Sequence, residues 1–107
     1  MSDYLPPFYR KVARRFPRLV EGHDALAAAA HEAGPLDAKT RHLVKLGITI
    51  GAGSIGGVQS HVRQALAEGA SREEVEHVAI LAASSVGFPA AVAALSWIND
   101  VLEAREG

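Results

Sequence analysis

Proline and glycine divide this chain into short segments, and each segment carries apolar residues at helical spacing. Proline fits the first turn of a helix, where its missing N–H has no helical partner, and glycine commonly follows the last turn. Nowhere do β-branched residues alternate for long enough, with turn signals around them, to indicate a sheet. The pattern predicts an all-α, compact domain of about six helices. The breaks fall at Pro6-Pro7, Pro17, Gly34-Pro35, the small-residue stretch 51–57, Gly69 and Gly87-Phe88-Pro89.

Two of these helices begin with recognisable caps. Asp37 is suited to be the N-cap of the third helix, because its carboxylate can accept a hydrogen bond from an N–H group of the first turn. Ser71, followed three residues later by Glu74, forms a capping box for the fifth helix. We therefore expect the third and fifth helices to begin directly after Asp37 and Ser71.

The third helix is expected to be largely buried. Leu43, Leu46 and Ile50 share one of its faces, and Val44 and Ile48 widen that face. The helix runs into the glycine-rich stretch 51–57. Glycine in a helix interior is about 1 kcal/mol less favourable than alanine. We expect this stretch to separate the third helix from the fourth.

The size of the chain, 107 residues, indicates a single domain over 1–107. Hydrophobic residues make up 49% of the sequence, and alanine supplies much of that share. Alanine removes little apolar area from water, so a core built from it gains less from burial than one built from leucine. Helices faced with small residues can pack closely across subunits, which favours a homo-oligomer, although the composition also allows a monomer.

The charges indicate neither a nucleic-acid nor a membrane partner. The formal net charge is −1, and acids and bases are spread along the chain. The one basic cluster, between Arg10 and Arg18, is interpreted as the solvated face of a short helix. No stretch approaches the roughly 20 apolar residues that span a bilayer, and the N-terminal residues do not form a signal peptide. We expect a cytoplasmic protein.

The chain contains no cysteine, which excludes thiol chemistry and leaves His61 as the leading reactive residue. His61 lies on the apolar side of the fourth helix, one turn after Gly57, and positions four apart are neighbours on a helix. The glycine is expected to leave a volume beside the imidazole in which a small ligand binds. The alternative is a histidine packed in the core or at a subunit contact, with its nitrogens hydrogen-bonded.

His42 lies on the third helix among apolar residues and can approach His61 if the third and fourth helices are antiparallel neighbours. A histidine pair would allow an acid/base relay. It could also bind a metal, but two ligands on separate helices, without a carboxylate at fixed spacing, make a poor zinc signature. We therefore expect neither a metal nor an organic cofactor.

Ser54 is a candidate only in a loose sense. No G-x-S-x-G turn surrounds it, which argues against a serine hydrolase. The neighbouring glycines do not match a phosphate-binding loop, because no strand precedes them and no Lys-Ser or Lys-Thr follows. A tight junction between helices is the better interpretation of these glycines.

Three stretches of the sequence form a recognisable set: Leu36 to Val44, then Ser60 to Leu66 with Gly69 to Val75 following, and Gly87 to Ala91. They resemble the carboxymuconolactone decarboxylase family, which includes the alkylhydroperoxidase D proteins. They occur in the family's order and spacing and together cover about residues 36–97. The resemblance implies an all-helical fold and homo-oligomers, commonly trimers or hexamers, with sites near subunit contacts.

In the peroxidase branch of the family, a Cys-x-x-Cys pair works with a histidine and a glutamate. The resemblance places the two cysteines at Ser54 and Gly57, the histidine at His61 and the glutamate at His42. Only the histidine is retained. A glycine cannot attack a peroxide, and a serine hydroxyl lacks the acidity of a thiol, so peroxidase activity by the family mechanism is excluded.

The decarboxylase branch also lacks the cysteine pair and keeps the histidine. The resemblance therefore implies lyase or isomerase chemistry on a small anionic organic molecule, with His61 as the proton donor. Arg41 or Arg63 would orient the substrate's carboxylate, unless these arginines form surface ion pairs instead. Two alternatives stay open: a non-catalytic oligomeric binding or scaffold protein that kept the fold, and a metal-dependent enzyme using His42 and His61.

Overall fold

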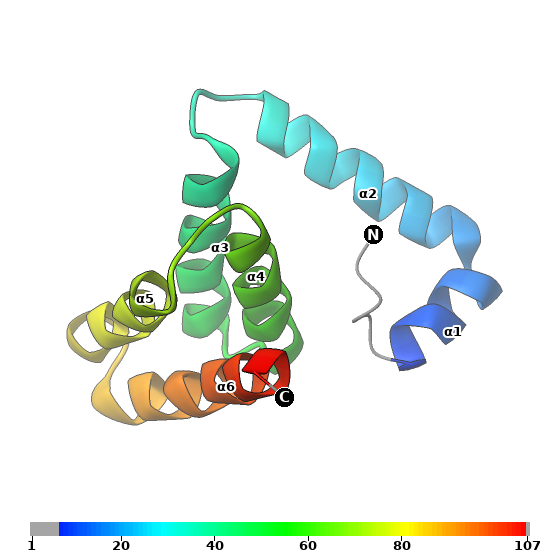
Figure 1. Cartoon of the computed structure of the whole chain (residues 1–107). Coiled ribbons are helices and arrows are strands. Elements are labelled where there is room, and N and C mark those ends of the chain that lie inside the picture. Colours follow the sequence, from blue (N-terminus) through cyan, green and yellow to red (C-terminus); the bar gives the residue numbers. More distant parts are fainter. Residues whose placement is uncertain (1–6, 107) are drawn as a thin grey trace. The chain divides into compact units, whose positions relative to one another are not determined.

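The computed structural model describes residues 7–106, and over that range the chain forms six helices and no strand (Figure 1). The prediction of an all-α protein with about six helices is confirmed. The chain divides into two compact units, which meet in sequence between Pro35 and Leu36 and are described separately. The helices are α1 (Pro7–Arg15), α2 (Pro17–Glu32), α3 (Ala38–Ala52), α4 (Ile55–Ala67), α5 (Arg72–Ser85) and α6 (Phe88–Glu106).

The first unit consists of α1 and α2. Only Phe16 separates the two helices, and Pro17 is the first residue of α2, where its missing N–H costs nothing. The N–H of Phe16 donates to the carbonyl of Val12, and the Phe16 carbonyl accepts from Leu19 and Val20. Proline thus redirects the chain without a loop. The cations of the basic cluster lie exposed, as expected for a solvated helix face: Arg10, Lys11, Arg14, Arg15 and Arg18.

The second unit packs α3 to α6 around one apolar core. In Figure 1, α3 and α4 lie side by side, and α6 contacts α3, α4 and α5. Gln59 of α4 donates through Nε2 to the Trp97 carbonyl of α6 at 3.2 Å. Many core positions hold alanine, which lets the helices approach closely. The buried apolar residues are Leu46, Ile50, Val58, Val62, Ala65, Ala70, Val75, Ala79, Ala82, Ala91, Ala94, Ile98, Val101 and Leu102.

The stretch 51–57 separates α3 from α4 as expected, but most of it is helical. Only Gly53 and Ser54 lie between the two helices. Gly53 ends α3 with a φ of 69°, in the left-handed region that favours glycine, and its N–H returns to the Ile50 carbonyl. The short connection makes α3 and α4 antiparallel neighbours.

In residues 7–106, no helix combines the length and apolarity needed to cross a membrane.

The expectation that α3 is largely buried is wrong for two of its five large apolar residues. Leu46 and Ile50 lie in the core, whereas Val44 is 48% exposed and Ile48 is 65% exposed. Val44 and Ile48 are one turn apart, so they form an outer stripe that α4, α5 and α6 do not cover. The spacing of apolar residues identifies those that share a helix face. It does not show which sides of the helix are covered by another element.

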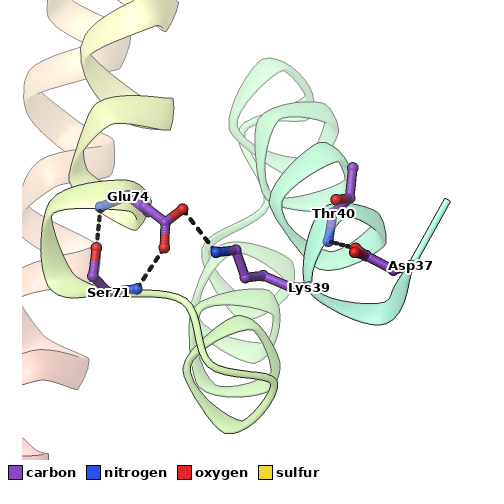
Figure 2. Close-up of polar contacts among 5 residues, drawn as sticks. All are labelled: Asp37, Lys39, Thr40, Ser71 and Glu74. Carbon is purple, nitrogen blue, oxygen red and sulfur yellow. Dashed lines mark hydrogen bonds and ion pairs between the residues drawn. The ribbon is translucent and has the colours of Figure 1, made fainter.

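A cluster of polar contacts fixes the beginnings of α3 and α5 (Figure 2). Asp37 accepts from the N–H of Thr40 at 2.8 Å. Ser71 and Glu74 form the expected capping box, with bonds of 2.9 and 3.1 Å. Lys39 of α3 reaches Glu74 of α5 at 3.0 Å, so one carboxylate joins the cap of α5 to α3.

These contacts favour the charged form of both carboxyl groups. The hydrogen bonds from Thr40 lower the pKa of Asp37. The hydrogen bond from the Ser71 N–H, followed by the contact with Lys39, lowers the pKa of Glu74. A carboxyl whose pKa is lower in the folded state stabilises the fold above its unfolded pKa, and that contribution is lost as the pH falls through the folded pKa.

We therefore expect the urea midpoint of unfolding to fall between about pH 7 and about pH 3, across the range in which carboxyl groups titrate. In Glu74→Gln the fall should be smaller, because the titrating group of the cap is gone. Glu73→Gln, which replaces a neighbouring exposed carboxyl outside the capping box, should retain the wild-type fall. Equal pH dependence in Glu74→Gln and the wild type would contradict this account.

Candidate functional site

His42 of α3 and His61 of α4 face each other in the second unit. Their Nδ1 atoms are 3.4 Å apart, their ring centroids are 5.6 Å apart, and the ring planes are tilted by 30°. His42 is only 6% exposed, while His61 is half-buried. The structure therefore brings the two predicted histidines together within one chain. A hydrogen bond can join them when one ring donates and the other accepts.

The packing of α3 against α4 brings the His42 and His61 rings close together. His42 continues the buried stripe of Leu46 and Ile50 at intervals of four residues. His61 lies beside the buried Val58 and Val62 of α4. Because the two stripes pack together and the connection is only Gly53-Ser54, the histidines meet about two to three turns from that connection.

Ser54 has a structural role that the sequence reading did not assign. It is the N-cap of α4, and its Oγ accepts from the N–H of Gly57 at 3.1 Å. The side chain is exposed. One lone pair of its oxygen is thus engaged in capping the helix, and the hydroxyl proton and a second lone pair are left for other contacts.

The space that a side chain at position 57 would occupy is filled by Thr49 and Ser54. A Cβ atom at Gly57 would lie 2.7 Å from Cγ2 of Thr49 and 2.8 Å from the Ser54 Oγ. The Thr49 hydroxyl donates to the carbonyls of Lys45 and Leu46 at 3.0 and 2.9 Å, which directs its methyl group toward Gly57. This contact explains why residue 57 is a glycine. Nothing in the sequence pattern pointed to Thr49, because it lies eight residues away on another helix.

Arg41 and Arg63 stand on the same two helices as the histidines. Arg41 donates through Nη1 to the Leu36 carbonyl at 2.8 Å, so its guanidinium is anchored near the start of α3. Its Nε is buried and has no hydrogen-bond partner. Arg63 follows His61 by two residues and is half-buried. Over the described part of the chain, no three histidine, aspartate or glutamate side chains gather in a way that could hold a metal ion.

A model of the carboxymuconolactone decarboxylase family matches residues 17–100. The chain belongs to this family. The match covers most of the chain, including all of α2 to α5 and the histidine pair. The recognition made from the sequence motifs is confirmed.

A solved structure supports the same assignment. The chain is similar to the crystal structure of an apo carboxymuconolactone decarboxylase family protein from Legionella pneumophila, with a TM-score of 0.75 and 26% sequence identity. The likeness covers 89% of this chain and 85% of that one. Among curated proteins, the chain is 31% identical over 64 residues to an uncharacterized protein of Haemophilus influenzae, a match that spans 60% of this chain and 57% of that relative.

Family membership together with the absence of cysteine defines what the site can do. The chain has the fold of the family but cannot form a thiolate or a disulfide. The titratable groups that face each other between α3 and α4 are the two imidazoles. An unperturbed imidazole has a pKa near neutral pH, so such a pair can take up and release protons.

The contact between Thr49 and Gly57 predicts the effect of small substitutions. Gly57→Ala should destabilise the protein by about 1–3 kcal/mol, because the new methyl group overpacks the junction. Gly56→Ala, whose Cβ meets open space, is the matched control and should stabilise α4 by up to about 1 kcal/mol.

Chemical denaturation measures the free energy of unfolding of Gly57→Ala, Gly56→Ala, Thr49→Ser and the double variant Thr49→Ser/Gly57→Ala. The double variant removes the Thr49 methyl group and should recover part of the stability lost in Gly57→Ala, beyond the sum of the single changes. The account fails if Gly57→Ala is tolerated as well as Gly56→Ala.

Proposed function

We propose that this protein is a cysteine-independent member of its family that performs acid/base chemistry at His61 on a small anionic organic molecule. Lyase or isomerase chemistry fits this site best. The observation that carries the proposal is the 3.4 Å approach of His42 and His61, one buried and one half-buried, in a family fold without cysteine. The proposal invokes no metal and no organic cofactor.

In a decarboxylation, the bond between the substrate carbon and its carboxylate breaks and carbon dioxide leaves. The electron pair of that bond stays on the carbon, and protonated His61 supplies the proton that forms the new C–H bond. In an isomerisation, neutral His61 would take a proton from one carbon and return it to another. Both reactions need one residue that can hold and release a proton near neutral pH.

An anionic substrate needs a cation to orient it. Arg41 is the better candidate of the two arginines, because its buried Nε lacks a hydrogen-bond partner and a buried unpaired donor is costly. A substrate carboxylate would satisfy that donor with a charge-assisted hydrogen bond. Arg63, two residues after His61, would add positive charge. Ser54 and Gly57 would contribute by holding the start of α4 in place rather than by contacting the reacting atoms.

His61→Ala tests the proposal. With γ-carboxylated lactones and related unsaturated carboxylates as substrates, carbon dioxide release or substrate rearrangement should fall at least about 100-fold. His77→Ala, which removes an exposed histidine of α5, is the matched control and should retain wild-type turnover. Unchanged turnover in His61→Ala would refute the assignment. A wild-type protein without turnover on any such substrate would favour the scaffold alternative.

We also propose that the protein assembles as a homo-oligomer, a trimer or a hexamer as is common in the family. The support comes from large apolar side chains that the second unit leaves exposed. These side chains are partly exposed, so burying each of them fully would contribute roughly 1–2 kcal/mol. They are Leu36, Val44, Ile48, Ile55, Ile80, Leu81, Val86, Phe88 and Val92.

Ile48→Glu should shift the mass measured by light scattering toward the monomer, because it places a charge within an interface that excludes water. Asn99→Glu, an exposed polar position on α6, is the matched control and should leave the mass unchanged. A wild-type protein that is monomeric at all concentrations would contradict the proposal.

A further inference from the structure

The geometry points to His42 as a positioning residue that determines which ring nitrogen of His61 carries a proton. His42 would accept a hydrogen bond from Nδ1–H of His61 and so keep Nε2 of His61 as the atom that takes and gives protons. This inference rests on the proposed function of His61. It concerns the distribution of protons in the resting protein, which can be measured without a substrate.

The two rings face each other through the same ring atom, Nδ1. The Nδ1 atoms of His42 and His61 are 3.4 Å apart. A neutral imidazole carries hydrogen on one ring nitrogen and a lone pair on the other. Two facing lone pairs repel, and two facing N–H groups clash. A favourable contact requires one ring with hydrogen on Nδ1 and the other with hydrogen on Nε2, so the pair demands opposite tautomers.

Burial decides which ring donates. His42 is 6% exposed, whereas His61 is half-buried and is the ring that a substrate can reach. If His61 holds hydrogen on Nδ1, its Nε2 is a base when neutral and an acid when protonated. In both forms the Nδ1–H keeps donating to His42. The proton that reacts therefore moves on and off Nε2, and His42 stays neutral throughout.

The charged residues of α3 and α4 include no carboxylate that could accept the hydrogen bond from Nδ1–H of His61, so the acceptor on these helices is the His42 imidazole. Histidines are commonly oriented by a carboxylate, but α3 and α4 contain no acidic residue. Their charged residues are the cations Lys39, Arg41, Lys45 and Arg63. On the helices packed against them, the described titratable side chains are exposed or ion-paired: Arg72, Glu73, Glu74, Glu76, His77, Asp100, Glu103 and Arg105.

Nitrogen-15 NMR of the histidine rings tests the inference in the full-length protein at a pH where the rings are neutral. His61 is expected to show hydrogen on Nδ1 and a bare Nε2, and His42 the opposite. His42→Asn places an amide oxygen close to the position of Nδ1 and should preserve the His61 tautomer. His42→Leu has a similar volume but no acceptor, and His61 should lose its Nδ1–H. The exposed His77 serves as the reference ring in each spectrum.

Two results would overturn the inference. One is hydrogen on Nε2 of both rings in the wild type, because the two bare Nδ1 atoms would then suit a metal ion and not a shared hydrogen bond. The other is an unchanged His61 tautomer in His42→Leu. The amide spectrum of each variant shows whether it is folded. If His42→Leu does not fold, His42→Asn still tests the inference. If the tautomers are as expected and turnover is absent, the proposed function fails and this inference stands.

Discussion

The close packing of α3 against α4 is the contact on which the site depends. The two helices are joined by only Gly53 and Ser54, and Thr49 occupies the space that a side chain at residue 57 would need. A larger residue at position 57 would push the helices apart at this junction. Because interiors are packed too densely to absorb such a shift locally, it would spread along α3 and α4 to His42 and His61. The 3.4 Å approach of the imidazoles is therefore tied to a glycine that lies one turn before His61.

Much of the fold could be predicted because helix ends are local events. Pro17, Asp37 and the capping box of Ser71 and Glu74 act through neighbouring backbone groups, so sequence spacing reveals them. The exposure of Val44 and Ile48 could not be predicted, because it depends on which sides of α3 receive a partner. The single-domain reading of residues 1–107 stays a prediction, since the chain divides into two compact units.

The candidate site was also predictable in part, because the helical period and a short connection are local features of the sequence. His42 and His61 could be paired from the short connection and the helical period, and the structure gives their separation. The contact of Thr49 with Gly57 and the anchoring of Arg41 by the Leu36 carbonyl depend on side-chain directions that no sequence pattern records. At the positions where the family resemblance places two cysteines, the structure has a helix cap and a filled junction. The reactive groups left at this site are imidazoles, which favour proton transfer.

The central claim, that His61 binds and acts on small organic anions, is tested most directly by the ring carbon–hydrogen NMR signals of the five histidines during titration with small carboxylates. The account predicts that a carboxylate ligand shifts the His61 signal, with a smaller shift at His42, and that the matched uncharged carboxamide shifts neither. His77, exposed on α5, should not respond. Equal responses to the carboxylate and the carboxamide, or carboxylate-induced shifts confined to residues away from α3 and α4, would contradict the claim.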